Sequence, residues 1–232
     1  MRPVGNLSIC TIPFEIAPFR LSGTVYGVLL NHSSALAELG PKAAQPPYNA
    51  APRAPVLYVK PRNTLIVSGS AVEIPAGMTE LEVGACLGLV IGRPACNVST
   101  TEARDYVAGY LIVNDVSVPH DNFYRPSIRL KARDGFCPLG PAVVGRDVVA
   151  DPDALTIRTY VDGVLVQAAT TAELVRSTAS LLADVTEFMT LAPGDVLAVG
   201  VARPCPRVRA GQSVNIVVDG LGTLSNRFVA AR

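Results

Sequence analysis

Short apolar runs separated by turn-forming residues dominate the chain and predict many β-strands. Runs of about four to eight β-branched and aliphatic residues between Gly, Pro, Asn and Asp are typical of strands. The run at 83–91 is almost continuously apolar, which favours a central strand with both faces buried. Asp162-Gly163 separates two such runs and predicts a hairpin with a two-residue turn. The predicted strands are 24–30, 56–59, 65–67, 83–91, 110–113, 155–161, 164–167, 196–201 and 214–218.

Helices are expected in fewer places. A short helix is predicted at 34–39, and a capping box of Ser99 and Glu102 predicts a second one that Gly109 ends.

The longest predicted helix covers 172–189, with Thr170 and Glu173 as a further possible capping box. Its apolar residues recur at helical spacing, so we assign that face to the core rather than to a cofactor. The face consists of Leu174, Thr178, Leu181, Leu182, Val185, Phe188 and Met189.

The segment 127–133 combines a strand pattern with concentrated charge. Ile128, Leu130 and Ala132 alternate with Arg129, Lys131 and Arg133, which predicts a half-buried strand with three cations on its polar face. Arg offers a planar fork for a carboxylate and Lys a compact charge, so this face suits a small polyanion. The alternative is a solvated edge strand whose charges discourage pairing with other chains. Asp134-Gly135 then predicts a turn, and Pro138 with Gly140 is expected to stop the run that follows.

Many short strands with few helices indicate a β-rich α+β domain. Residues 1–22 show no sustained period and are interpreted as an extended arm, which leaves 23–232 as a single domain without internal repeats.

Composition narrows the function classes. With 232 residues and a net charge of +1, the chain carries no charge excess that would imply a nucleic-acid or membrane partner. The five scattered cysteines contain no Cys-x-x-Cys, which argues against disulfides and a structural zinc site. No signal pattern or membrane span is recognised, so we expect a cytoplasmic protein.

The order of motifs resembles the fumarylacetoacetate hydrolase family over nearly the whole chain. Tyr124–Gly135 resembles the branch that degrades homoprotocatechuate (4-hydroxyphenylacetate), and most closely the N-terminal-type half or subunit of its bifunctional isomerase/decarboxylase. The resembling motifs are Gly27–Asn31, Lys60-Pro61, Val90–Gly92, Tyr106–Ser117, Phe136–Pro141, Leu191–Val196 and Asp219–Asn226.

The resemblance implies a fold of packed and rolled β-sheets with peripheral helices, usually dimeric. It also implies a mechanism in which Mg²⁺ or Mn²⁺, held by three carboxylates, chelates a 2-oxo acid and stabilises an enolate. In the family, a lysine and a mobile glutamate-histidine pair position or move protons.

Carried over position by position, the metal site is incomplete. The family Glu-x-Glu falls at Gly84 and Cys86, which leaves Asp115 as the surviving metal ligand. One carboxylate does not hold Mg²⁺ or Mn²⁺ against water, so we expect the ion to be absent or weakly bound. Asp115 also has an alternative interpretation, as a turn or capping aspartate. Glu80 and Glu82 form a displaced Glu-x-Glu, which we interpret as a solvated strand end rather than a substitute ligand pair.

The proposed catalytic residues are Lys131, Glu38 and His32. Lys131 matches the family lysine and Glu38 the family glutamate, whereas the family histidine falls at Ala35. His32 is a candidate replacement, or else a packed surface residue. The proposed substrate-binding residues are Arg125, Arg129, Arg133 and Lys60.

Two functions follow from these observations. In the first, the chain decarboxylates 5-oxopent-3-ene-1,2,5-tricarboxylate and isomerises 2-hydroxyhepta-2,4-diene-1,7-dioate, with Lys131 supplying charge or a proton in place of the metal. In the second, it is a metal-free structural subunit that completes a heteromer with a metal-competent relative. A homodimer is the alternative assembly, and hydrolysis of a 1,3-diketone or decarboxylation of oxaloacetate is a weaker hypothesis.

Overall fold

The computed structural model describes residues 21, 23–120 and 127–231, and its strands form three sheets. In spatial order, the seven-stranded sheet contains β2 (Val56–Lys60), β1 (Val25–Leu29), β11 (Val196–Ala198), β6 (Ala85–Ile91), β7 (Val107–Asn114), β8 (Cys137–Gly145) and β3 (Leu65–Val67). The five-stranded sheet contains β10 (Val164–Thr170), β9 (Thr156–Val161), β13 (Ser213–Val218), β14 (Gly222–Ala230) and β4 (Ala71–Ile74). A small third sheet pairs β12 (Arg207–Val208) with β5 (Leu81–Glu82).

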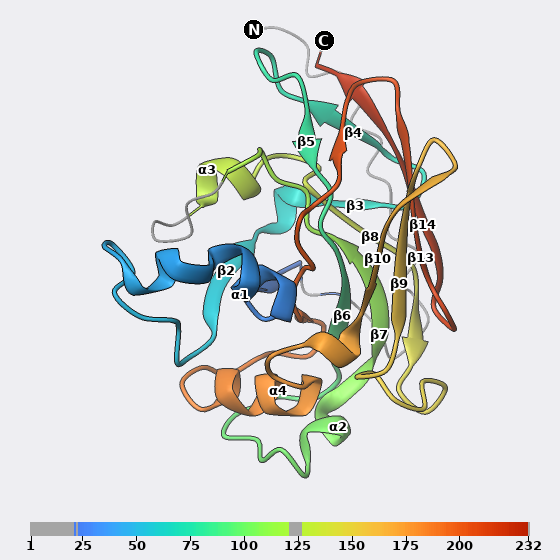
Figure 1. Cartoon of the computed structure of the whole chain (residues 1–232). Coiled ribbons are helices and arrows are strands. Elements are labelled where there is room, and N and C mark those ends of the chain that lie inside the picture. The colour runs from blue at the N-terminus through green and yellow to red at the C-terminus, as the bar shows by residue number, and fades with distance from the viewer. Residues whose placement is uncertain (1–20, 22, 121–126, 232) are drawn as a thin grey trace, which may run out of the picture.

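Short helices lie around these sheets. The α-helices are α1 (Ser33–Leu39), α2 (Ala103–Tyr106), α3 (Ile128–Lys131) and α4 (Thr178–Thr186), and the 3-10 turns are η1 (Gly40–Ala44), η2 (Arg62–Thr64) and η3 (Thr171–Glu173). Figure 1 shows the five-stranded sheet on the right, with α1, α3 and α4 at the opposite side of the molecule. The predicted mostly β fold with packed sheets and peripheral helices is confirmed. None of the described helices is long and apolar enough to cross a membrane.

One hydrophobic core joins the two large sheets. It contains Leu87 and Ile112 of the seven-stranded sheet, Ile216 and Phe228 of the five-stranded sheet, and Leu181 of α4, all fully buried. Each such side chain contributes about 1.5–3 kcal/mol by leaving water. The two sheets therefore stabilise each other. The single domain expected for 23–232 stays a prediction. The predicted arm at 1–22 lies outside the described residues except for position 21.

The segment 127–133 is a helical turn, so the predicted strand is wrong. The carbonyl of Ser127 accepts hydrogen bonds from the backbone N–H groups of Leu130 (3.0 Å) and Lys131 (2.9 Å). A helical turn brings positions four apart to one side, and Ser127 and Lys131 are accordingly buried. Ile128, assigned to the core by the alternation, is 68% exposed. A short alternating run does not by itself distinguish a strand from a surface turn.

The first capping box is also wrong. The Ser99 hydroxyl donates to the Glu102 carboxylate (2.6 Å) instead of accepting from a backbone N–H, and α2 begins at Ala103 without a side-chain cap. Gly109 lies inside β7 rather than at a helix end. A Cβ there would collide with the Val144 carbonyl of β8, so glycine allows the two strands to approach.

Helix α4 is shorter than the predicted 172–189 because tertiary bonds compete for its first residues. The backbone N–H groups of Val175 and Arg176 donate to the Asn31 carbonyl (2.9 Å) and to its side-chain oxygen (3.0 Å). Ser177 then caps the helix. Phe188, placed on the core face by the pattern, is 65% exposed because it follows the end of α4.

The remaining strand predictions succeed where a turn motif marks the strands and fail elsewhere. The hairpin of β9 and β10 is confirmed, with Asp162 and Gly163 at φ of 48° and 82°. Pro138 and Gly140 do not end the run after the turn, since both lie inside β8. Strands β4 and β14, which pair with each other in the five-stranded sheet, were not predicted from the sequence.

Candidate functional site

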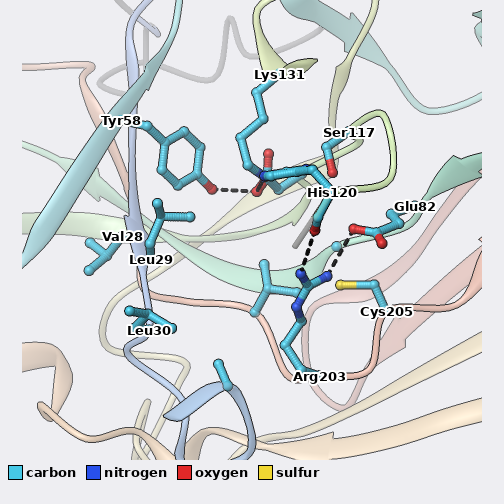
Figure 2. A pocket seen from close by; sticks show the side chains of 14 residues that line it. Val28, Leu29, Leu30, Tyr58, Glu82, Ser117, His120, Lys131, Arg203 and Cys205 are labelled. Atoms are coloured by element: carbon cyan, nitrogen blue, oxygen red, sulfur yellow. Dashed lines mark hydrogen bonds and ion pairs between the residues drawn. The ribbon is translucent and has the colours of Figure 1, made fainter. Parts of the chain in front are cut away.

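Asp115 is the centre of a buried charge cluster just after β7. Its backbone N–H donates to the Gly84 carbonyl (2.8 Å), which fixes it beside the start of β6. Its carboxylate Oδ2 accepts hydrogen bonds from Lys131 Nζ and Tyr58 Oη, both at 2.5 Å. Its Oδ1 forms an ion pair with Lys60 Nζ at 2.9 Å. The structure thus brings Asp115 and Lys131 together, and Figure 2 shows Lys131 next to Tyr58, with the Lys131 Nζ atom 4.8 Å from the centre of the Tyr58 ring.

Lys60 ties three segments of the chain together. Its ammonium donates to the backbone carbonyls of Val116 (2.6 Å), Lys131 (2.8 Å) and Phe136 (2.8 Å). A lysine has three N–H donors, so these bonds together with Asp115 use them fully. Lys60 does not line the neighbouring cavity. The structure therefore gives Lys60 a role in holding the site together rather than in contacting a ligand.

The cluster keeps Asp115 ionised. Burial alone raises the pKa of the Asp115 carboxyl, but the charges of Lys131 and Lys60 outweigh it and hold the pKa below its ordinary value. Burial, and then the charge of Asp115, raise the pKa of Tyr58 well above its ordinary value. At neutral pH the site therefore holds a carboxylate and a neutral phenol beside the two lysine side chains.

A cavity of about 430 Å³, including its open mouth, lies beside this cluster. Figure 2 shows Val28, Leu29 and Leu30 on one side, with Glu82, Arg203 and Cys205 on the other. Its full lining is Val28, Leu29, Leu30, Ala35, Tyr58, Glu82, Gly84, Asp115, Ser117, His120, Lys131, Val201, Arg203 and Cys205.

Arg203 organises the second polar side of the cavity. Its guanidinium lies 2.8 Å from the Glu82 carboxylate, 3.3 Å from the Glu38 carboxylate and 3.3 Å from the His120 carbonyl. Glu82 is only 6% exposed, so the prediction of a solvated strand end is wrong for Glu82. Glu80, its partner in the motif, instead pairs with Arg207 at 2.7 Å. Arg203 was not predicted because a single arginine in the loop after β11 belongs to no motif or periodic pattern.

His120 is a second residue that sequence patterns missed. Its Nδ1 lies 2.8 Å from the Val118 carbonyl, which only accepts hydrogen bonds. Nδ1 therefore carries the ring proton, and Nε2 holds the lone pair. Burial, assisted by the charges of Lys131 and Arg203, lowers the pKa of His120.

His32, by contrast, lies outside this cavity. It caps α1, where its Nδ1 accepts from the Ser34 backbone N–H (3.3 Å), and its Nε2 lies 3.8 Å from the Glu173 carboxylate. Ala35, the position of the family histidine, does line the cavity from α1. Glu38 reaches the site through its ion pair with Arg203.

Arg129 and Arg133, two members of the predicted arginine grip, are not among the residues that line the cavity. The helical turn leaves Arg129 exposed, and Arg133 donates to the Arg129 carbonyl (2.9 Å) rather than pointing into the cavity. Arg125 lies outside the described residues. The guanidinium that does line the cavity belongs to Arg203.

The residues present do not fit a divalent metal ion. Asp115 faces two ammonium groups, which repel a cation. A Cβ at Gly84 would come within 2.6 Å of the Asp115 carbonyl oxygen. Burial raises the pKa of the Cys86 thiol well above its ordinary value, so this position supplies no anionic ligand. Within the described ranges, no group of three or more His, Cys, Asp or Glu residues is arranged to hold a metal ion.

Fold and site together define the class: a mostly β protein whose packed sheets carry a charged, partly enclosed cavity. The family model described as "Fumarylacetoacetate (FAA) hydrolase C-terminal" matches residues 24–229. The chain therefore belongs to the fumarylacetoacetate hydrolase family. The assignment to the N-terminal-type half of the bifunctional enzymes stays a prediction.

Individual relatives share both sequence and fold with this chain. It is 42% identical over 210 residues to a 4-hydroxyphenylacetate degradation bifunctional isomerase/decarboxylase of Salmonella dublin, a match that covers 90% of this chain and 48% of that enzyme. The chain thus spans about half the length of this curated relative. The structure of 5-carboxymethyl-2-hydroxymuconate delta-isomerase from Mycobacterium smegmatis superposes with a TM-score of 0.78 at 32% identity, covering 91% of this chain and 80% of that one.

A more distant relative carries a metal. Maleylpyruvate hydrolase from Sphingobium sp. SYK-6, in complex with manganese (II) ion and pyruvate, superposes with a TM-score of 0.75 at 27% identity, covering 90% of this chain and 71% of that one. A divalent metal is thus present in the family, whereas the donor set of this chain does not fit one.

Proposed function

We propose that this chain supplies one fumarylacetoacetate hydrolase-like unit of an isomerase/decarboxylase in 4-hydroxyphenylacetate degradation. Its cavity takes a small di- or tricarboxylate, with 5-oxopent-3-ene-1,2,5-tricarboxylate and 2-hydroxyhepta-2,4-diene-1,7-dioate as the substrates. The name of the relative from Salmonella dublin supports the pathway, and the chemistry of the cavity supports the substrate class.

The observation that carries the proposal is the pair of cationic side chains, Lys131 and Arg203, that line the cavity. Lys131 and Arg203 line the cavity and Lys60 lies behind it, whereas the carboxylates beside them belong to Asp115 and Glu82. Glu38 also pairs with Arg203 at 3.3 Å, so three carboxylates balance the three cations, and the cavity offers two fixed cationic donors rather than a net charge. Lys and Arg donors bind carboxylates through charge-assisted hydrogen bonds, so these two side chains support a small di- or tricarboxylate as the ligand.

Lys131 is the residue through which this cavity assists the reaction. When carbon dioxide leaves the tricarboxylate, the electron pair of the broken bond moves through the double bond to the keto oxygen and forms a dienolate. An ammonium group fixed by Asp115 at 2.5 Å stabilises negative charge on that oxygen. This assigns to Lys131 the charge that a metal supplies elsewhere in the family.

Turnover of the tricarboxylate by the purified chain, with and without EDTA, tests this function. We expect equal rates in both conditions, because the cation belongs to the protein. Lys131→Met should lower kcat by about 10²-fold or more, while exposed Lys42→Met serves as the matched control. If no turnover is seen with or without EDTA, the chain is not a catalyst on its own. If turnover is lost only with EDTA, Lys131 does not take the place of a metal.

The second candidate is a metal-free structural subunit, and the occupied Asp115 carboxylate favours it. Oδ1 and Oδ2 are both engaged by side chains of this chain. Co-expression with a family member that retains Glu-x-Glu should then yield a stable heteromer on size-exclusion chromatography. A chain that remains a homodimer in that mixture counts against this function.

A further inference from the structure

We propose that the Ser117 hydroxyl and the Lys131 ammonium group together bind one carboxylate of the ligand. This inference rests on the proposed function and deepens it, because it assigns a binding role to a serine outside the charge cluster. Ser117 and Lys131 both line the cavity, and the two residues are only 3% and 6% exposed. Figure 2 shows Ser117 between Lys131 and Glu82. Two buried hydrogen-bond donors therefore face the same enclosed space.

The backbone of Ser117 is fixed, whereas its side chain is not hydrogen-bonded. Its N–H donates to the Glu82 carbonyl at 3.2 Å, and its carbonyl accepts from the Glu82 N–H at 2.8 Å. This bridge joins the segment after β7 to β5. Within the residues that the structure describes, the Ser117 hydroxyl has no hydrogen-bond partner. A buried hydroxyl costs free energy until it finds a partner, so an oxygen of a ligand is favoured at this position.

Lys131 also has unused hydrogen-bond donors. As an ammonium group paired with the Asp115 carboxylate, it carries three N–H bonds. In the described part of the chain, Nζ makes one hydrogen bond, to Oδ2 of Asp115 at 2.5 Å. The centre of the Tyr58 ring lies 4.8 Å from Nζ, and an aromatic face attracts the charge without replacing a hydrogen-bond acceptor. Two N–H groups of Lys131 are therefore available to a ligand.

This set of donors matches a carboxylate. Each carboxylate oxygen accepts hydrogen bonds, so one oxygen takes the Ser117 O–H and the group as a whole takes the charge-assisted bonds of Lys131. Glu82 does not compete for these donors, because its carboxylate pairs with Arg203 at 2.8 Å. A cavity of about 430 Å³, including its open mouth, suits a small dicarboxylate. Ser117 thus contributes to ligand affinity rather than to the stability of the fold.

Isothermal titration with glutarate, a stable dicarboxylate probe, tests this subsite. We expect Ser117→Ala to weaken glutarate binding by about tenfold, because a hydrogen bond to a charged group is lost. Ser127→Ala is the matched control and should leave the affinity unchanged. Ser127 is also buried, and its hydroxyl also lacks a partner among the described residues, but it does not line the cavity. Unchanged affinity in Ser117→Ala, equal losses in both variants, or no saturable binding to the wild type would overturn the inference.

Urea unfolding separates a binding role from a structural one. Ser117→Ala removes no hydrogen bond of the described fold, so its unfolding midpoint should stay at or above that of the wild type. Weaker binding together with a lowered midpoint would make Ser117 a structural residue and overturn the inference.

The binding experiment is also independent of the proposed function, because it does not measure turnover. An inactive wild type whose glutarate affinity depends on Ser117 would refute the proposed catalysis and support this subsite. An active chain whose glutarate affinity is the same in Ser117→Ala would refute the subsite alone.

Discussion

At the scale of the residue, the Asp115 carboxylate determines the charge of the whole site. It is buried and contacts Lys131, Lys60 and Tyr58. A buried ion pair is a weak source of net stability, yet removal of one partner is costly because the other charge stays in a poorly solvating environment. Asp115 should therefore be the most sensitive polar position of this cavity.

Asp115→Asn should reduce the free energy of unfolding by about 3–5 kcal/mol at neutral pH, since two buried ammonium groups lose their counter-ion. Because the folded-state pKa of Asp115 is lowered, its contribution is complete above the ordinary value of about 3.9 and is lost as the pH falls through the folded value. The difference in the free energy of unfolding between the wild type and Asp115→Asn should therefore become smaller below about pH 4. Urea unfolding at several pH values measures this.

The matched control is Asp219→Asn, which removes an exposed ion pair with Arg158 at 2.8 Å. It should lose much less stability than Asp115→Asn. Equal losses in the two variants would contradict the central role of Asp115.

A second residue-scale prediction compares Glu82→Gln with Glu80→Gln. Glu82 is buried against Arg203, so its neutralisation should reduce the free energy of unfolding by about 1–3 kcal/mol. It should also tighten glutarate binding several-fold, because a negative charge leaves the cavity. Isothermal titration and urea unfolding measure the two effects. Glu80 pairs with Arg207 outside the cavity, so Glu80→Gln should leave glutarate binding unchanged.

Sequence patterns found part of this site because family motifs mark certain residues. Asp115, Lys131 and Lys60 lie in such motifs, and all three meet in the structure. Arg203 and His120 come from loops whose folding brings them to the cavity, and no local period encodes that approach.

At the scale of the element, the pairing of β1 with β2 determines where the Tyr58 side chain lies in the site. Gly27 of β1 lies opposite Tyr58 of β2, and a Cβ at this glycine would overlap the Tyr58 ring. The absence of a side chain at position 27 is thus what lets the Tyr58 hydroxyl reach Asp115.

Gly27→Ala should reduce the free energy of unfolding by about 1–3 kcal/mol through overpacking. It should also weaken glutarate binding, because Tyr58 must move away from Asp115. Chemical denaturation and isothermal titration measure both effects. Gly145→Ala in β8 is the matched control, since nothing lies within 4 Å of its added Cβ. Equal effects in both variants would contradict the contact with Tyr58.

The elements that could be predicted were those marked by a motif in their own stretch of sequence. The β9–β10 hairpin has its Asp-Gly turn, and β6 has its continuous apolar run. The predicted strand at 127–133 failed because its alternation coincided with a helical turn held by the Ser127 carbonyl. Helix α4 was overextended because Asn31, far away in the sequence, binds the backbone ahead of it.

At the scale of the whole molecule, the two large sheets share one core. Leu87 and Phe228 come from different sheets and belong to the same buried cluster. Neither sheet keeps its apolar face out of water without the other, so a partly unfolded chain exposes much of that core.

We therefore expect one cooperative unfolding transition for the described domain. Far-UV circular dichroism and tyrosine fluorescence should give coincident urea curves, as a two-state transition requires. Two separated transitions would contradict the single domain predicted for 23–232.

The close packing of Gly84 against the Asp115 carbonyl limits which side chains can be introduced at position 84. Glutamate at this position would force the backbone at Gly84 away from the Asp115 carbonyl before any metal could compensate for the strain. A Gly84→Glu variant should therefore be less stable than the parent chain, whatever ion is added.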